Sequence, residues 1–197
     1  YNRDWKNIKT ISNTDLEYLY IRSAYTDNVL DKETKEMTDF YLSVVEKNWT
    51  QYGLYERSLI AILMGREGKT AVVDDILKSF REHATRSEEM GMYWANNRAH
   101  VFMSQSAVSV HTFIMDAFRA GGAGAEEMDE MKRWLLKQKQ TQLWETTHAT
   151  ADAVYALLSG GSDWFSTEGE TSLSLGKLRV EPESKELGSG YIKESWR

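Results

Sequence analysis

Two carboxylates that stand within otherwise apolar helical stretches are the first candidates for chemistry in this sequence. Asp116 lies in the stretch 101–120 and Asp152 in the stretch 146–158. A buried carboxylate without a partner is costly, so each must meet a base, a hydroxyl group or water. If both faced one cavity, they could act as general acid and general base on a glycosidic bond. The alternative is that they line a solvated opening and take part in no reaction.

Three aromatic side chains in loops could serve the same chemistry. Tyr93 and Trp94 belong to the segment Gly91-Met92-Tyr93-Trp94, and Trp144 ends the segment Thr141-Gln142-Leu143-Trp144. Beside a pair of catalytic acids, these rings could bind a sugar by stacking. Large aromatic side chains more often supply buried apolar area, and the second interpretation is that they pack between helical repeats.

Metal, thiol and phosphate chemistry have little support. The four histidines, at positions 83, 100, 111 and 148, form no His-x-x-x-His or His-x-x-Glu pair. The absence of cysteine excludes disulfides, zinc-thiolate sites and a thiol nucleophile within this sequence. The glycines at 121, 122 and 124 follow no strand, so the setting of a phosphate-binding loop is missing. We therefore expect no metal site and no cofactor.

Composition narrows the classes of partner. The sequence has 197 residues, 24 Lys and Arg against 30 Asp and Glu, and a net charge of −6. Nucleic-acid binding depends on clustered basic residues, which are absent here, so we expect no nucleic-acid partner. No apolar run approaches the ~20 residues that cross a bilayer. The chain opens at Tyr1 without a signal peptide, and we expect it to be a fragment.

The elements that would position these residues are helices of two types, which alternate along the chain. One type is apolar on nearly every face, and the other carries a single apolar stripe. The first type is expected at 15–25, 54–64, 101–120 and 146–158, and the second at 31–51, 70–84 and 126–139. The predicted apolar stripes of the three one-sided helices are, in order, Met37, Phe40, Tyr41, Val44, Val45 and Trp49; Val73, Ile76, Leu77 and Phe80; and Met128, Met131, Trp134 and Leu135. A loop is expected around Gly91, between two of these helices.

The alternation is a repeat of an apolar helix, a glycine turn, a one-sided helix and an aromatic loop. Residues 60–80 align with residues 114–134 in this way. Two-helix repeats of roughly 40–50 residues are typical of solenoids and closed rings of hairpins. Because apolar and one-sided helices take turns, we predict two concentric layers. The predicted fold is all-α, a partial α/α toroid of about seven helices over residues 1–161, four inner and three outer.

The pattern changes after Gly161. Apolar residues alternate with polar ones at 171–175 and 178–180, residues 181–184 read as a turn, and 191–193 as another short strand. Residues 162–197 are therefore predicted to begin a β-rich second domain.

The stretch Trp144-Glu145-Thr146-Thr147-His148-Ala149-Thr150-Ala151-Asp152-Ala153-Val154-Tyr155-Ala156-Leu157-Leu158 resembles the end of the thioester domain of bacterial alpha-2-macroglobulin proteins. The segment Gly91-Met92-Tyr93-Trp94 and the glycine-turn repeats also fit that family. Overall the resemblance covers residues 13–158. The tail, with Tyr191 and Trp196, is similar to the return of that family's chain into its CUB-like domain.

This resemblance implies a non-enzymatic module of a large endopeptidase inhibitor, which is cleaved at a bait region and traps the proteinase. It implies a periplasmic, membrane-anchored or extracellular parent protein. The expected partners are neighbouring domains of the parent chain and the target proteinase. The family's Cys-x-x-Gln thioester motif does not occur in this sequence. A glycan-processing toroid that uses Asp116 and Asp152 is the alternative, and a scaffold domain without further partners is the third possibility.

A partial ring would expose the apolar faces of its first and last hairpins. We therefore expect the isolated chain to form a dimer or to be only modestly stable.

Overall fold

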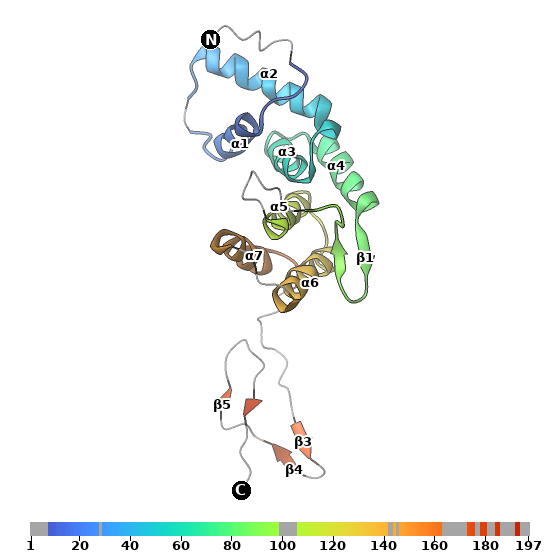
Figure 1. The fold of residues 1–197 in the computed structure, drawn as a ribbon. Coiled ribbons are helices and arrows are strands. Elements are labelled where there is room, and N and C mark those ends of the chain that lie inside the picture. The colour runs from blue at the N-terminus through green and yellow to red at the C-terminus, as the bar shows by residue number, and fades with distance from the viewer. Residues whose placement is uncertain are drawn as a thin grey trace. The chain divides into compact units, whose positions relative to one another are not determined.

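The computed structural model describes residues 8–27, 29–98, 106–141, 144 and 146–162, and four short strands between 173 and 193. The chain divides into two compact units, Tyr1–Ser162 and Asp163–Arg197, which are considered separately. In the first unit the described residues form seven α-helices, as the sequence predicts (Figure 1). They are α1 (Asn13–Arg22), α2 (Lys32–Asn48), α3 (Leu54–Arg66), α4 (Thr70–His83), α5 (Ala107–Ala120), α6 (Ala125–Thr141) and α7 (Thr147–Ser159). A 3-10 turn, η2 (Trp49–Gln51), follows α2.

The four helices predicted to be apolar form one row. Helix α1 packs on α3, α3 on α5, and α5 on α7. The one-sided helices α2 and α4 pack on α3, and among the helices α6 packs more on α5 than on α7, so that α2, α4 and α6 flank the row (Figure 1). The helices predicted to be apolar thus form the row, and the helices predicted to be one-sided lie beside it. The closure of such a row into a toroid stays a prediction.

Burial follows the helix types in the middle of the row. In α3, every residue from Leu59 to Met64 is buried. The predicted apolar stripes of α4 and α6 are confirmed: the buried apolar residues are Val73, Ile76, Leu77 and Phe80 in α4, and Met128, Met131, Trp134 and Leu135 in α6. The stripe of α2 is confirmed only in part, because Val44 and Val45 are buried whereas Met37, Phe40, Tyr41 and Trp49 are half-buried.

The two helices at the ends of the row are less buried than their composition predicts. In α7 only Ala149, Ala153 and Ala156 are buried, whereas Tyr155 and Leu158 are 55% and 64% exposed. In α1 only two leucines are buried. The expectation of burial on most faces is therefore wrong for α1 and α7. The physical reason is that each has a row neighbour on one side only among the described helices.

Glycine turns end α3 and α5 in the same way. Gly68 and Gly122 have φ values of +72° and +76°, a left-handed conformation that costs glycine little. At the end of α3 the amide of Lys69 donates to the carbonyl of Met64 at 2.8 Å, and the matching bond at the end of α5 is 2.9 Å. These bonds satisfy carbonyls that the helix leaves unpaired. The repeat seen in the sequence therefore holds at the level of hydrogen bonds.

A β-hairpin occupies the segment that was expected to be a loop around Gly91. Strands β1 (Thr85–Ser87) and β2 (Gly91–Tyr93) pair antiparallel, with Ser87 opposite Gly91 and Thr85 opposite Tyr93. Strand β2 packs on α6. Three-residue strands are too short to show a clear period-two pattern, which is why the sequence predicted no hairpin here.

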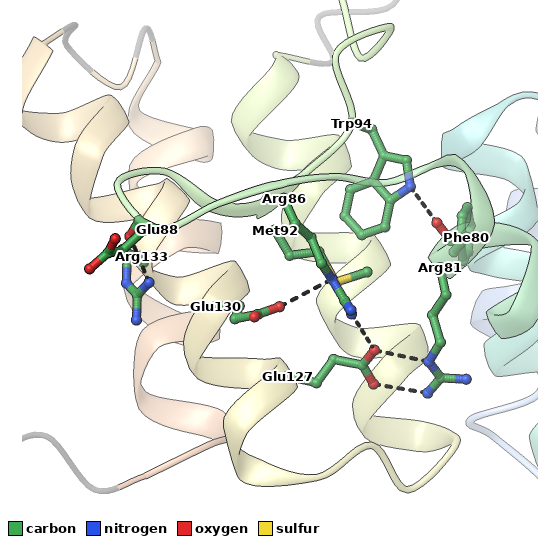
Figure 2. A network of polar contacts seen from close by, with 9 residues as sticks. All are labelled: Phe80, Arg81, Arg86, Glu88, Met92, Trp94, Glu127, Glu130 and Arg133. Atoms are coloured by element: carbon green, nitrogen blue, oxygen red, sulfur yellow. Dashed lines mark hydrogen bonds and ion pairs between the residues drawn. The ribbon is translucent and has the colours of Figure 1, made fainter.

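Charged side chains fasten this hairpin to α4 and α6 (Figure 2). Arg81 of α4 donates two hydrogen bonds of 2.9 Å to the carboxylate of Glu127. Arg86 of β1 lies 3.1 Å from Glu127 and 3.2 Å from Glu130, both on α6. Two arginines from different elements thus share one half-buried carboxylate, which ties three elements together.

The residue that follows strand β2, Trp94, belongs to an aromatic cluster. The ring of Trp94 packs edge-on against Phe80 at a centroid distance of 5.7 Å and lies 6.1 Å from Phe118. Its Nε1–H donates to the carbonyl of Phe80 at 3.0 Å, which satisfies the buried indole donor (Figure 2). Trp94 therefore joins α4 and α5 through both apolar and polar contacts.

The residues after α7 are held against α6. Lys132, whose side chain is 2% exposed, donates from Nζ to the carbonyl of Ser162 at 2.9 Å. Asp129 accepts a 2.9 Å hydrogen bond from the amide of Ser162. Gly161 has a φ of +78°, and a Cβ there would lie 2.3 Å from Oδ1 of Asp129. We refer to residues 160–162 and these two contacts as the clip.

The described residues of the second unit form two antiparallel strand pairs. Strand β3 (Leu173–Leu175) pairs with β4 (Leu178–Val180), and β5 (Ser184–Lys185) pairs with β6 (Ile192–Lys193). Ser184 begins a strand rather than ending a turn, contrary to the expectation for 181–184. Within the described parts of the chain, no helix has the length and apolar character that a bilayer span requires.

Gly91 provides a test of the contact between β2 and α6. Its φ is +70°, and a Cβ would lie 2.0 Å from the carbonyl oxygen of Glu130. We expect Gly91→Ala to destabilise the protein by about 1–3 kcal/mol more than Gly122→Ala, because overpacking adds to the cost of the backbone conformation. Chemical denaturation of both variants measures the difference.

Gly122 is the matched control, since its φ is also positive and no atom lies within 4 Å of a Cβ built there. Gly122→Ala alone should cost about 1–2 kcal/mol. Equal losses in the two variants would show that β2 does not press on α6.

Candidate functional site

Asp116, on α5, lies in a polar cluster near the carboxyl-terminal ends of α5 and α7. Its side chain is 22% exposed, and its Oδ1 accepts a 2.8 Å hydrogen bond from Arg119, one turn further along the helix. Arg119 also donates to the hydroxyl of Tyr155 at 3.2 Å and to the carbonyl of Ser159 at 3.3 Å, both on α7. The carboxylate of Asp116 is thus paired with an arginine that connects two row helices.

Asp152 lies on α7 and is 23% exposed. Its Oδ2 is 2.9 Å from Nδ1 of His148, one turn earlier in α7, an ion-pair approach that lacks hydrogen-bond geometry. Asp152 therefore meets a base, as the cost of burying a carboxylate requires.

The two carboxylates influence each other. Burial raises the pKa of the Asp116 carboxyl above its ordinary value. The positive charges of Arg119 and Arg66 oppose this rise in pKa, and the negative charge of Asp152 adds to it. The structure thus brings Asp116 and Asp152 into one electrostatic environment.

Two arginine–tyrosine contacts join neighbouring row helices near their carboxyl-terminal ends. Arg66, the last residue of α3, stacks over the ring of Tyr20 at 4.9 Å and donates to the Tyr20 carbonyl at 2.9 Å. Arg119 of α5 stacks over the ring of Tyr155 at 5.3 Å. In each case a cation from the last turn of one helix reaches the carboxyl-terminal turn of its neighbour, where the helix dipole is negative. Sequence reasoning missed both arginines, although each stands at the end of an apolar helix.

The aromatic candidates lie in another environment. Trp94 is 2% exposed, and its ring contacts Phe80, Phe118 and His111, so it is part of the core. Tyr93 is half-buried and stacks on Trp134 at 6.5 Å. The half-buried Trp144 donates from Nε1 to the carbonyl of Leu135 at 3.3 Å. These contacts share no residue with those described above for Asp116 and Asp152.

His111 is fully buried between aromatic rings. It stacks on Trp134 at 4.3 Å, and its Nε2 lies 3.1 Å from the carbonyl of Met131. A carbonyl accepts, so Nε2 carries the hydrogen, and Nδ1 has no hydrogen-bond partner. Burial lowers the pKa of His111 to about 4, and the hydrogen bond to Met131 only partly opposes this.

The remaining histidines show no shared site. His83 lies 2.8 Å from the carbonyl of Ser79, and position 100 lies outside the described residues. In the ranges that the structure describes, no three His, Asp or Glu side chains come together as metal ligands would.

A surface cavity of about 410 Å³ lies among α1, α2 and the end of α3. Its lining combines apolar side chains such as Leu19 and Leu63 with charged ones of both signs, such as Lys35, Asp39 and Arg66. No motif in the sequence points to it. Arg66 belongs both to this lining and to the cluster around Asp116.

Comparison of the chain with protein-family models, with curated proteins and with solved structures gave no significant match.

The buried imidazole of His111 predicts how stability depends on pH. Below pH 6.5 the unfolded imidazole takes up a proton, whereas the native one does so only near pH 4. The unfolded state therefore binds more protons in this window, and stability falls as the pH falls. From pH 6.5 to 4 the loss assigned to His111 is roughly 3 kcal/mol. Urea denaturation at several pH values measures it.

His111→Gln should remove this part of the pH dependence, because an amide can still donate to Met131 but does not titrate. The exposed His83 gives the matched control, and His83→Gln should keep the slope of the wild type. A slope unchanged in His111→Gln would show that another group is responsible.

Proposed function

We propose that this chain is a non-enzymatic docking module of a large bacterial inhibitor of endopeptidases, similar to the alpha-2-macroglobulin family. In this proposal the helical unit packs against neighbouring domains of the parent protein, and the parent traps the proteinase after cleavage at a bait region. The resemblance over residues 144–158 and the repeat of helix types support it. The parent would act in the periplasm, at a membrane or outside the cell.

The observation that carries the proposal is an exposed apolar stripe on α7. Ala151, Val154, Tyr155 and Leu158 recur at helical spacing, and all four are exposed, the last three by 44%, 55% and 64%. We call these residues the α7 stripe. An exposed contiguous apolar surface is typical of a place where another protein surface docks. Since the opposite side of α7 packs on α5, the α7 stripe offers a rigid face to a partner.

The parent inhibitor provides the test. A trapped proteinase keeps access to a small peptide substrate but loses access to a large protein substrate, because the cage excludes the latter. After incubation with the parent, we expect cleavage of a protein substrate to fall at least tenfold while cleavage of a peptide substrate persists. Unchanged cleavage of both substrates would contradict the proposal.

Variants of the α7 stripe test the role of this module within the parent. Leu158→Glu should reduce the trapped fraction several-fold without preventing bait cleavage, because it places a charge in the docking face. Glu33, exposed on α2 away from this face, gives the control variant Glu33→Gln, which should trap normally.

A second candidate function has its own supporting observation. Asp152 contributes to the raised pKa of Asp116, as expected for a general acid beside a second carboxylate. In this proposal the chain hydrolyses a glycan, with Asp116 as the acid and Asp152 as the base. The partly exposed rings of Tyr93 and Trp144 are the remaining candidates for sugar contacts.

This second proposal predicts loss of hydrolysis on removal of either charge. With a set of bacterial oligosaccharides as probes, Asp116→Asn and Asp152→Asn should each lower any reducing-end release by at least a hundredfold. Asp75→Asn on the exposed face of α4 is the control. Activity that survives both substitutions, or no activity in the wild type, would exclude this function.

A further inference from the structure

Within the part of the chain that the structure describes, the row of helices has at each end an apolar surface on which no other helix packs. At one end is the α7 stripe. At the other end, Tyr18 and Ile21 of α1 and Tyr25 just after it are 45%, 57% and 61% exposed. We call these three residues the α1 patch. Between the ends, α3 and α5 each have a row neighbour on both sides. The two surfaces are therefore the places where the row would accept one more row helix.

We call the contact between two neighbouring row helices a joint. The joints inside the row show which features an added helix must have. In two of them, an arginine from the last turn of one helix reaches the carboxyl-terminal turn of the adjacent helix: Arg66 reaches Tyr20, and Arg119 reaches Ser159. Both joints also place the guanidinium over a tyrosine ring. A new joint of the same kind needs an apolar stripe, a last-turn arginine and a helix end with accessible carbonyls.

Helices α1 and α7, at the two ends of the row, have features that complement each other in this way. Helix α1 has Arg22 in its last turn, beside the α1 patch, and Arg22 already donates to a carbonyl, that of Tyr25. Helix α7 has no basic residue in its last turn, and the cation that reaches its carboxyl-terminal end, Arg119, belongs to α5 and donates to the carbonyl of Ser159. The other carbonyls of that turn keep the negative charge of the helix dipole. The positive charge of Arg22, beside the α1 patch, therefore complements the negative carboxyl-terminal end of α7, beside the α7 stripe.

We propose that a second copy of this chain docks head to tail, with the α7 stripe of one copy on the α1 patch of the next. In this arrangement Arg22 of one copy lies at the carboxyl-terminal end of α7 in the other. The inference rests on the proposed function in that both use the α7 stripe as a docking face; within the parent protein, a neighbouring domain would take the place of the second copy.

Head-to-tail docking covers both apolar surfaces, whereas a symmetric pairing of two α7 stripes would leave the α1 patch exposed. The interface is heterologous, because two different surfaces of the chain meet in it. An open assembly of any length keeps one free α7 stripe at one end and one free α1 patch at the other. The average mass in solution should therefore rise steadily with concentration rather than stop at a dimer.

Two variants that each block one surface test the proposal. Leu158→Glu blocks the α7 stripe and Ile21→Glu blocks the α1 patch, and both positions are exposed, so the fold should persist. Analytical ultracentrifugation should find each variant monomeric by itself. An equimolar mixture should form a dimer and nothing larger, because one intact stripe and one intact patch remain to meet. Circular dichroism of each variant checks the fold.

The control is Leu136→Glu, since Leu136 is an exposed apolar residue of α6 outside both surfaces, and this variant should assemble like the wild type. Dimers of Ile21→Glu alone would indicate symmetric pairing of α7 and overturn the proposal. A wild type that is monomeric up to millimolar concentration would also overturn it. The docking function is tested separately by proteinase trapping in the parent, so either can fail without the other.

Discussion

The structure depends on one constraint: a helix that is apolar on nearly every face needs neighbours on more than one side. Helices α3 and α5 meet it, because each lies between two row helices and carries a flanking helix. Their burial fixes the order of the row and places α4 and α6 beside it. The same constraint leaves α1 and α7 short of a neighbour among the described helices. The apolar surfaces at the ends of the row follow from it.

Much of this fold could be predicted, because the pattern of a helix records how many of its faces are buried. The stripes of α4 and α6 were predicted residue by residue for this reason. The hairpin could not be predicted, since its strands are short and its position is set by Gly91 against the backbone of Glu130, a contact between distant segments. The exposure of Tyr155 and Leu158 was missed because composition shows what a helix can bury, not which neighbours it has.

The candidate site shows the same limit. Asp116 and Asp152 stand out in the sequence as charges in apolar helices, and the structure places them in one electrostatic environment. Their setting depends on Arg119, which joins α5 to α7 across 36 residues through Tyr155, and no local pattern indicates such a pair. Trp94 has a role in the core, because its indole donor reaches Phe80 across 14 residues. Aromatic content alone could not separate that role from sugar binding.

The clip at residues 160–162 bears on how the helical unit would respond to mechanical force. Helix α7 buries three alanines and is joined to α5 by the hydrogen bonds from Arg119 to Tyr155 and Ser159. Tension applied to the chain beyond Ser162 meets the bonds from Lys132 and Asp129 first, and these lead into α6. The force therefore acts first on α6, which is held in the core by Met131, Trp134 and Leu135, and not on the end of α7.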